Sequence, residues 1–389
     1  MKVAVDDAIP YAQAAFAAAG EVRLFSGRSL RPADLSDVDA LIVRSVTRVD
    51  ARLLAGSPLR FVGTATIGMD HLDLDYLRAH RIRYANAAGS NANSVAEYVV
   101  AALLATAARR GWRLSAKSLA VIGVGRIGTL VARKAAALGM NVLLCDPPLR
   151  ESTGDTRYGL LDDVLGADIL TLHVPLTAEG PYPTRHLVNR QLLGRLSRRQ
   201  FLINSARGAV ICGSDLLTAL RERWIEGAVL DVWEGEPIID RDLLQLVDLG
   251  TPHIAGYSQD GKAQATYMIL AELRMFFGIS DAWDCSRLFA PAQRLSPQSG
   301  AEGEAAVRSV VLQAYDIRGD DADLRTVMGM PATAAGERFD RLRDHYPLRP
   351  EFRHFVVEPA AGSGLAPVYQ ALGFQVANPA QPEAALRET

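Results

Sequence analysis

An arginine, a glutamate and a histidine stand in stretches where they could together move a proton. Arg207 lies in INSARGAV, Glu236 in DVWEGEP and His253 in GTPHIAGYS. The ordinary pKa of histidine, about 6.5, suits it to acid and base catalysis near neutral pH. A carboxylate can orient the ring, and a guanidinium fork can bind a substrate carboxylate. Because each residue alone also fits a structural role, the prediction of an acid/base site depends on their joint occurrence.

A glycine-rich stretch between a predicted strand and a predicted helix indicates a dinucleotide site. Gly123, Gly125 and Gly128 form G-x-G-x-x-G in VIGVGRIGTL, and Asp146 follows 18 positions after the last glycine. The glycines allow a tight turn, close approach of backbone to pyrophosphate, and close packing of helix on strand. The carboxylate of Asp146 favours NAD, because it would repel the 2'-phosphate of NADP. The nearby Arg150 leaves some tolerance of NADP open.

Strands and helices that would position these residues alternate along the chain. This alternation predicts an α/β fold with a Rossmann-type doubly wound parallel sheet, a flavodoxin-like substrate domain and a small C-terminal α/β domain. Predicted strands cover residues 1–6, 40–45, 60–65, 118–123, 141–146, 168–174, 200–206 and 227–233. Predicted helices cover residues 11–19, 73–80, 94–108, 126–138 and 258–277.

The predicted domain boundaries follow from this order of elements. The substrate domain takes residues 1–95 and 257–285, and the nucleotide-binding domain takes residues 96–256. A stretch at 286–306, rich in Ser, Pro, Gly and Ala, is interpreted as a linker. The C-terminal domain is expected to extend to about residue 380, and the last dozen residues are expected to fray.

Composition narrows the class of protein further. Of the 389 residues, 49% are hydrophobic and 22% charged, which is typical of a globular protein, and the formal charge of -2 argues against non-specific nucleic-acid binding. The cysteines Cys145, Cys212 and Cys285 form no CxxC pair, so neither a disulfide framework nor a metal site is expected. Asp6 and Asp7 interrupt any secretory signal, and no apolar run reaches membrane-spanning length. We therefore expect a cytoplasmic protein.

The motifs GVGRIG, NSARGAV, LDVWEGEP and TPHIAGY together resemble the D-isomer-specific 2-hydroxyacid dehydrogenases. The resemblance implies oxidation of a small hydroxyacid with NAD, in which Arg207, Glu236 and His253 carry catalysis and His253 is the general base. It also implies cofactor contacts at Gly123, Gly125, Arg126, Ile127, Gly128, Asp146, Val174, Ser205, Ala206, Asp231 and Gly256.

A closer resemblance extends over residues 1–375 and includes the C-terminal segment YDIRGDDADLR, which general members of this family lack. It implies a substrate with a carboxylate and a phosphate at opposite ends, with contacts at Ser45, Thr66 and Tyr257. Because two anionic ends need two binding sites, Arg44 is a further candidate, with Ser45 and Tyr257, for the polar tail and the phosphate. It further implies a homodimer formed through the C-terminal domain. Three arginines of that domain are candidates to reach a partner's site, although such arginines are more often surface ion pairs: Arg318, Arg325 and Arg343.

Two alternatives stay open from the sequence. The first is another dehydrogenase of the same family, of the phosphoglycerate or hydroxypyruvate type. The second is a protein that senses NAD without turnover and resembles the C-terminal-binding corepressors, in which cofactor binding stabilises a dimer. The intact set of Arg207, Glu236 and His253 disfavours the second alternative.

Overall fold

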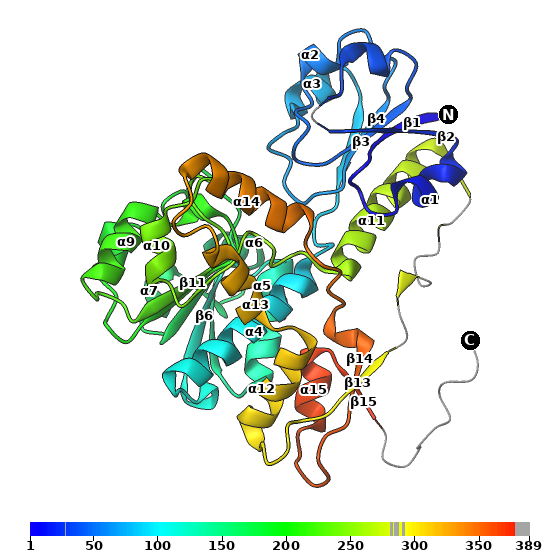
Figure 1. The fold of residues 1–389 in the computed structure, drawn as a ribbon. Helices are drawn as coiled ribbons and strands as arrows, with labels where there is room; N and C mark the ends of the chain where they lie inside the picture. The colour runs from blue at the N-terminus through cyan, green and yellow to red at the C-terminus, as the bar shows by residue number, and fades with distance from the viewer. Residues whose placement is uncertain (28, 281–282, 284–287, 290–291, 378–389) are drawn as a thin grey trace. The chain divides into compact units, whose positions relative to one another are not determined.

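The computed structural model describes residues 1–389 except 28, 281–282, 284–287, 290–291 and 378–389. The described residues form two compact units. Unit 1 comprises the described residues of 1–91 and 258–289, and unit 2 comprises the described residues of 92–257 and 292–377 (Figure 1). The predicted boundary at 285/286, Cys285 and most of the predicted frayed tail lie outside the described residues.

Unit 1 is built on a five-stranded sheet of order β2-β1-β3-β4-β5, in which every neighbouring pair is parallel. This is the flavodoxin-like order that was predicted. Its strands are β1 (Lys2–Asp6), β2 (Glu21–Phe25), β3 (Ala40–Val43), β4 (Phe61–Thr64) and β5 (Arg83–Asn86). Its helices are α1 (Ala12–Phe16), η1 (Ala17–Ala19), η2 (Pro32–Leu35), α2 (Ala51–Leu54), α3 (Leu74–Ala79) and α11 (Gln259–Phe277).

Both faces of this sheet are buried, which explains why its strands read as continuous apolar runs. Val3 and Ile42 pack on one face in a cluster that includes Ile269 of α11. Leu41 packs on the other face in a cluster that includes Leu77 of α3. The helix α11 therefore returns the chain to unit 1 after it has passed through unit 2.

The sheet of unit 2 has seven strands in the order β12-β11-β10-β9-β6-β7-β8, again with parallel neighbours. The strands are β6 (Ser118–Ile122), β7 (Asn141–Cys145), β8 (Tyr158–Gly159), β9 (Ile169–Leu172), β10 (Phe201–Asn204), β11 (Gly227–Leu230) and β12 (Leu249–Gly250). The helices around them are α4 (Ala92–Arg110), η3 (Leu114–Ala116), α5 (Arg126–Ala137), α6 (Pro147–Thr153), α7 (Leu161–Val164), α8 (Arg190–Leu193), η4 (Gly208–Val210), α9 (Gly213–Arg221) and α10 (Arg241–Leu246). The order confirms the Rossmann-type prediction.

The register of this sheet brings several strand ends to one level. Asn204, the last residue of β10, pairs with Leu172 of β9 on one side and with Leu230 of β11 on the other. Parallel strands share one carboxyl edge, and open α/β sheets bind their ligands along it. The loops that follow β6, β7, β9, β10, β11 and β12 therefore form a continuous rim along one edge of the sheet.

The C-terminal residues add a three-stranded sheet and four α-helices to unit 2. The sheet has the order β13-β14-β15 and consists of β13 (Gln293–Leu295), β14 (Phe355–Val357) and β15 (Gln375–Val376). The helices are α12 (Gly303–Ala314), α13 (Ile317–Arg325), α14 (Ala332–Asp344), η6 (Phe352–His354) and α15 (Ala366–Leu372). The stretch predicted as a linker thus contains a strand, because Gln293–Leu295 pairs with β14 instead of remaining extended in solvent.

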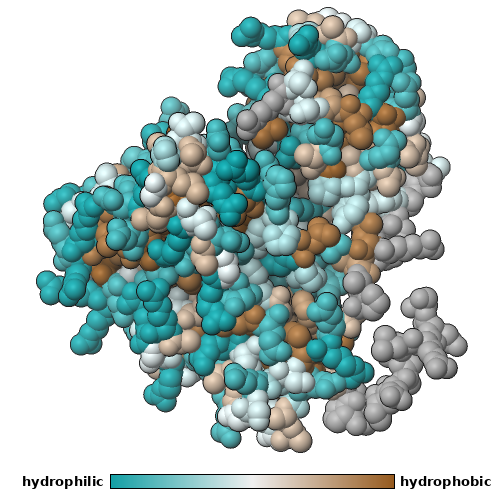
Figure 2. Space-filling model, viewed as in Figure 1, coloured by the Kyte–Doolittle hydropathy of each residue, from teal (hydrophilic) through white to brown (hydrophobic). Residues whose placement is uncertain are grey.

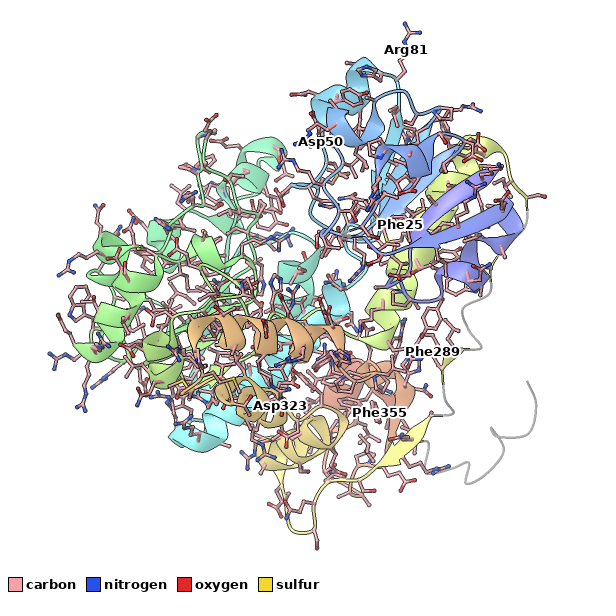
Figure 3. All side chains as sticks on the ribbon, turned by 45° about the horizontal axis from the view of Figure 1, so that its top comes forward. Phe25, Asp50, Arg81, Phe289, Asp323 and Phe355 are labelled. Carbon is pink, nitrogen blue, oxygen red and sulfur yellow. The ribbon has the colours of Figure 1, made fainter. Side chains whose placement is uncertain are left out.

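These C-terminal elements share their core with the Rossmann part. Val310 of α12, Phe352 of η6 and Tyr369 of α15 belong to the cluster that contains the buried face of α4. Figure 3 labels Asp323 on α13 and Phe355 on β14 in this part of the chain. The face of unit 2 seen in Figure 2 is mostly hydrophilic, as expected when the apolar side chains lie in these clusters.

A buried polar network joins the two parts of unit 2 across this core. Oε1 of Glu97, on α4, accepts hydrogen bonds from Asn93 Nδ2 at 2.9 Å and from the Phe352 N–H at 3.0 Å. Glu351 accepts a bond from Asn93 at 2.7 Å and one from Ser94 Oγ at 2.8 Å. Burial and the charge of Glu351 raise the pKa of Glu97 to about 8. The network therefore holds a carboxyl group that resists ionisation.

Each predicted strand and helix is present, but several further elements were not predicted, among them the short strands β8, β12 and β13. The strands β2 and β5 were not predicted, since EVRLF and RYAN carry charged or polar residues that mask an apolar strand pattern. Among the described residues, no helix is long and apolar enough to cross a membrane.

Candidate active site

The side chains of His253 and Glu236 form a close pair in unit 2. Nδ1 of His253 lies 2.7 Å from Oε2 of Glu236. The other carboxylate oxygen, Oε1, accepts a 2.7 Å hydrogen bond from the Trp233 N–H. The His253 side chain is 33% exposed and that of Glu236 19% exposed. With Nδ1 engaged by the carboxylate, Nε2 is the ring nitrogen left to exchange a proton with a substrate.

The backbone around His253 is held in an uncommon conformation. His253 has φ 57°, in the left-handed region that residues other than glycine seldom occupy. Its N–H donates to the carbonyl oxygen of Asp231 at 2.7 Å. The Asp231 carboxylate accepts bonds from the Ile254 N–H at 2.8 Å, the Ala255 N–H at 3.0 Å and Thr251 Oγ1 at 2.6 Å. The buried Asp231 therefore fixes the loop that carries the histidine.

Arg207 comes from the neighbouring loop after β10. Asn204 shapes this loop, because its Oδ1 accepts the Ala206 N–H at 3.0 Å and its Nδ2 donates to the Arg207 carbonyl at 3.0 Å. A Cβ at Gly208 would lie 2.0 Å from the Trp233 carbonyl oxygen, so only glycine allows this approach. The loops that carry Arg207 and Glu236 thus lie against each other, and all three predicted catalytic residues belong to one rim of unit 2.

The electrostatic environment keeps Glu236 ionised. Burial disfavours its charged form, but the hydrogen bond and charge of His253, the Trp233 N–H and the charge of Arg343 outweigh burial and lower its pKa below the ordinary value. For Asp231, burial is the dominant influence and raises its pKa, against the charge of His253 and the bonds from Thr251, Ala255 and Ile254. The carboxylate beside the histidine is therefore the one suited to stabilise a protonated ring.

The glycine-rich loop after β6 has the geometry that a dinucleotide requires. Gly123 has φ 88°, and a Cβ at Gly128 would lie 2.0 Å from the Gly123 carbonyl oxygen. A Cβ at Gly125, by contrast, would meet no atom within 4 Å, so this backbone is open to a ligand. Arg126 begins α5, whose N-terminal N–H groups favour phosphate. The residues present therefore fit a bound dinucleotide.

Asp146 follows β7 directly, beside this loop. Its carboxylate accepts the Val124 N–H at 2.8 Å through Oδ2 and the Leu149 N–H at 3.0 Å through Oδ1, and the second bond caps α6. A hollow of about 510 Å³ lies next to it between α6 and the loop after β9. Its lining residues are Pro148, Glu151, Ser152, Thr177, Glu179, Pro181 and Tyr182.

Further predicted cofactor residues lie on the same rim. Val174 follows β9, and Ser205 and Ala206 follow β10. Ser205 Oγ is buried and has no hydrogen-bond partner among the described residues, which is consistent with a polar group reserved for a ligand. Ile127 lies in α5, and Gly256 follows the histidine loop.

Three of the predicted substrate residues belong to unit 1. Arg44 and Ser45 follow β3, and Thr66 follows the neighbouring strand β4, so they lie at the carboxyl edge of that sheet. Arg44 Nε bonds Asp6 Oδ1 at 3.1 Å. Thr66 Oγ1 lies 2.7 Å from Thr64 Oγ1 and donates to the Gly68 carbonyl at 3.2 Å.

The fourth substrate residue, Tyr257, lies in unit 2 and contacts the C-terminal helix α14. Its hydroxyl accepts a 3.2 Å hydrogen bond from Arg343 Nη2 of the same chain. Arg318 instead pairs with the nearby Asp316, and Arg325 bonds Asp321 and backbone carbonyls. Of the three arginines considered from the sequence, Arg343 is therefore the one beside the predicted site, and it reaches that site within its own chain.

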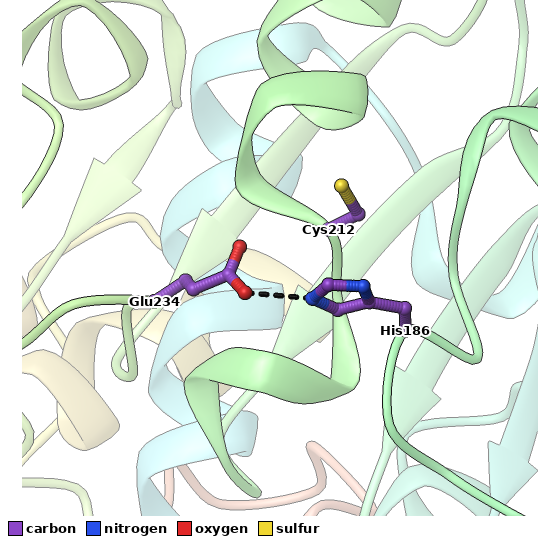
Figure 4. Close-up of side chains that lie close together, drawn as sticks. All are labelled: His186, Cys212 and Glu234. Atoms are coloured by element: carbon purple, nitrogen blue, oxygen red, sulfur yellow. Dashed lines mark hydrogen bonds and ion pairs between the residues drawn. The ribbon is translucent and has the colours of Figure 1, made fainter.

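A second histidine–glutamate pair lies near the first along the sequence. His186 Nε2 is 2.6 Å from Glu234 Oε1, and the other oxygen of Glu234 accepts the Gly213 N–H at 3.0 Å (Figure 4). Cys212 completes a group of three potential metal-ligating side chains. Because the pair already satisfies both carboxylate oxygens and joins two loops, we interpret it as a structural link, which sequence reasoning missed.

Comparisons with known proteins agree with this geometry. Residues 84–255 match the family model described as D-isomer specific 2-hydroxyacid dehydrogenase, NAD binding domain, and residues 290–373 match a domain of unknown function. An erythronate-4-phosphate dehydrogenase of Salinibacter ruber is 45% identical over 371 residues, covering 93% of this chain and 95% of the relative. One from Cronobacter sakazakii is 42% identical over 377 residues, covering 96% and 98%.

Solved structures give the same fold. A D-lactate dehydrogenase of Aquifex aeolicus, complexed with NAD and lactic acid, is 26% identical with a TM-score of 0.59, and the match covers 72% of this chain and 96% of that one. A glyoxylate/hydroxypyruvate reductase of Sinorhizobium meliloti, complexed with NADP and malonate, is 25% identical with a TM-score of 0.59, covering 72% and 95%.

Proposed function

This chain belongs to the erythronate-4-phosphate dehydrogenases, within the D-isomer-specific 2-hydroxyacid dehydrogenases, and we propose that it oxidises 4-phospho-D-erythronate with NAD. The product is (R)-3-hydroxy-2-oxo-4-phosphooxybutanoate, and the reaction is a step of pyridoxal 5'-phosphate biosynthesis. The observation that carries the proposal is the His253–Glu236 pair, on the same rim as Arg207, in a chain that matches these relatives over more than nine-tenths of its length.

His253 is the general base in this proposal. Its Nε2 takes the proton of the C2 hydroxyl while C2 loses a hydride and becomes a carbonyl. NAD, held by the residues of the glycine-rich loop, would supply the acceptor for that hydride. Glu236, bonded to Nδ1 at 2.7 Å, compensates the positive charge that forms on the ring. Because the pKa of Glu236 lies below its ordinary value, the carboxylate is ionised wherever the histidine works as a base.

Arg207 binds the substrate carboxylate and polarises the reacting oxygen. The guanidinium presents a planar fork that fits a carboxylate through two parallel hydrogen bonds. One of its nitrogens, Nη1, donates to the Ala206 carbonyl at 2.8 Å. This bond restricts the orientation of the fork and leaves its other N–H groups for the substrate.

The rim of unit 2 carries the residues that would hold NAD. The open backbone at Gly125 and the start of α5 at Arg126 would bind the pyrophosphate, and Asp146 would accept a hydrogen bond from the adenosine ribose. The hollow beside α6 offers space next to Asp146 for the rest of the adenosine. Further proposed contacts are Gly123, Ile127, Gly128, Val174, Ser205, Ala206, Asp231 and Gly256. Because the Asp231 carboxylate already accepts three bonds, its main role here is to hold the His253 loop.

The remaining assignments concern the substrate, the assembly and the cell compartment. We propose Arg44, Ser45, Thr66 and Tyr257 as substrate-binding residues. We further propose that residues 1–95 with 257–285, 96–256 and 286–380 act as substrate, nucleotide-binding and dimerisation domains of a cytoplasmic homodimer. The family models support a distinct C-terminal domain, because residues 290–373 match a different model from residues 84–255.

Comparing substrates tests the reaction. The purified protein is mixed with NAD and with 4-phospho-D-erythronate, 3-phosphoglycerate or D-lactate, and NADH absorbance is followed. The proposal expects turnover with 4-phospho-D-erythronate and little with the other two. Turnover with only one of the other two acids would support the dehydrogenase chemistry but show that 4-phospho-D-erythronate is not the substrate. No NADH from any of them, with NAD bound, would overturn the proposed activity.

A further inference from the structure

The last turn of α14 places a guanidinium beside the proposed active site. Arg343 donates from Nη2 to the Tyr257 hydroxyl at 3.2 Å, and its guanidinium carbon lies 5.8 Å from the centre of the Tyr257 ring. Its charge also acts on Glu236, the partner of His253. Arg343 therefore belongs to the same site as the proposed base, although it comes from the C-terminal part of the chain.

Arg343 is partly buried and makes only a long ion pair with a carboxylate among the described residues. Its side chain is 26% exposed, and its Nη1 lies 4.0 Å from Asp340 Oδ1. Its Nε is buried and has no hydrogen-bond acceptor among those residues. Buried cations are normally paired with carboxylates, so a guanidinium in this state has donors to offer an anion. The exposed Arg318, by contrast, lies 2.7 Å from its own Asp316.

The C-terminal part of the chain also holds Tyr257, the hydrogen-bond partner of Arg343, in place through further contacts. Arg349 Nη2 donates to the Ala255 carbonyl at 2.8 Å, two residues before the tyrosine. Tyr346 packs edge-on against Tyr257 with ring centres 6.0 Å apart. The Tyr346 hydroxyl is in turn bonded to Asp320 of α13 at 2.9 Å. The loop, the tyrosine and the arginine are therefore held as one unit by α13, α14 and the segment after α14.

The substrate of the proposed reaction has two anionic ends, and one arginine cannot bind both. Arg207 is assigned to the carboxylate at C1, beside the carbon that is oxidised. We propose, on the basis of that assigned reaction, that Arg343 together with the Tyr257 hydroxyl binds the phosphate at C4. Arg343 is thus a specificity-determining residue, and the C-terminal part of the chain selects phosphorylated hydroxyacids over unphosphorylated ones.

Arg343→Met tests this role, because methionine keeps much of the apolar stem and removes the charge and the fork. Arg341→Met is the matched control: Arg341 lies on the same turn of α14 and is exposed. Steady-state kinetics are measured with 4-phospho-D-erythronate and with D-erythronate, its unphosphorylated analogue. Arg343→Met is expected to raise KM for the phosphorylated substrate about 10²-fold and to lower kcat/KM for D-erythronate far less, because D-erythronate loses only the indirect effect of the Arg343 charge on Glu236. Arg341→Met should behave like the wild type on both.

The two substrates separate a phosphate contact from an indirect effect. An equal loss on both substrates would mean that Arg343 acts through Glu236 or through Tyr257, and it would overturn the proposal. Unchanged kinetics on both would overturn it as well. Should the methionine variant fail to fold, Arg343→Gln carries the same comparison.

Measuring phosphate binding tests the proposed phosphate site independently of the proposed reaction. If the wild type oxidises neither compound, the reaction is wrong, and inorganic phosphate then serves as the probe. Phosphate is expected to raise the Tm of the NAD-bound wild type and of Arg341→Met but not of Arg343→Met. An equal phosphate effect on all three proteins, or none on the wild type, would show that Arg343 holds no phosphate site.

Discussion

The imidazole of His253 and the carboxylate of Glu236 meet at 2.7 Å, and the same carboxylate is anchored to the Trp233 N–H at 2.7 Å. Only two residues before it, Glu234 makes a similar 2.6 Å bond to His186. Both pairs join a histidine to a glutamate from one short loop, but only the first belongs to the proposed catalytic residues. Substitutions in the His186–Glu234 pair can therefore serve as a control for substitutions in the His253–Glu236 pair.

Glu236→Gln should abolish most turnover while the protein stays folded. The amide keeps the size of the side chain but loses the charge that stabilises the protonated ring. We expect kcat to fall by about 10² to 10⁴-fold, in the range found when the carboxylate of comparable histidine pairs is neutralised. Glu234→Gln is the matched control and should keep near-normal kcat. A similar loss in both variants, measured with the same substrate, would contradict the assignment.

Arg207→Lys should lose activity although it keeps a positive charge. A lysine ammonium cannot reproduce the two parallel bonds of the guanidinium, so kcat/KM should fall about 10²-fold or more. Arg221→Lys provides the comparison, because it alters an exposed ion pair between Arg221 of α9 and Asp242 of α10. Steady-state kinetics of both variants are compared with those of the wild type. If Arg207→Lys is as active as Arg221→Lys, Arg207 does not bind the substrate carboxylate.

Two alanine substitutions in the glycine-rich loop should separate folding from cofactor binding. A Cβ at Gly125 meets no atom within 4 Å, so Gly125→Ala should keep the wild-type Tm while its methyl group blocks the pyrophosphate. A Cβ at Gly128 would be 2.0 Å from the Gly123 carbonyl, so Gly128→Ala should destabilise the fold by about 1–3 kcal/mol. Thermal unfolding and NAD titration measure the two effects. Normal NAD affinity in Gly125→Ala would contradict the proposed pyrophosphate site.

The buried carboxyl of Glu97 should make stability fall as pH rises. Burial and the charge of Glu351 raise its pKa to about 8, so the folded state retains a proton that the unfolded state releases above about pH 4.5. Between these values the folded state binds more protons, and the free energy of unfolding therefore decreases with pH, by at most about 1.4 kcal/mol per pH unit.

Glu97→Gln should remove that contribution to the pH dependence. Urea unfolding at pH 5.5 and pH 8 is expected to show a smaller loss of stability in the variant than in the wild type. Asp168→Asn serves as a comparison, because the hydrogen bonds of Ser118 lower the pKa of Asp168 against the effect of burial. The same slope in Glu97→Gln and the wild type would mean that Glu97 is ionised in the folded protein.

Much of the fold followed from local patterns in the sequence. Continuous apolar runs such as residues 118–123 predicted strands because both faces of a parallel sheet are buried. The G-x-G-x-x-G motif located the nucleotide loop because its glycines are required sterically: a Cβ at Gly128 would collide with Gly123. The strand β13 was hidden in a stretch rich in Ser and Pro, because its pairing partner, β14, lies sixty residues further along the chain.

From the sequence, only those site residues could be predicted that lie in a recognisable motif. His253, Glu236 and Arg207 stand in recognisable stretches, but their support comes from side chains with no local signature. Asp231 could be singled out, yet its bonds to the Ile254 and Ala255 N–H groups depend on the tertiary fold. The placement of Arg343 beside Tyr257 joins residues 86 positions apart, which no periodicity in the sequence could indicate.

Single-turnover formation of NADH by the wild type and by His253→Asn tests the central claim most directly. Asparagine tolerates the left-handed backbone at φ 57° but cannot act as the base. With 4-phospho-D-erythronate and excess enzyme, a single-turnover format prevents slow product release from hiding the chemical step. We predict rapid NADH formation by the wild type and a rate at least about 10²-fold lower in the variant, with NAD affinity retained. A variant that forms NADH at the wild-type rate would contradict the assignment of His253 as the base.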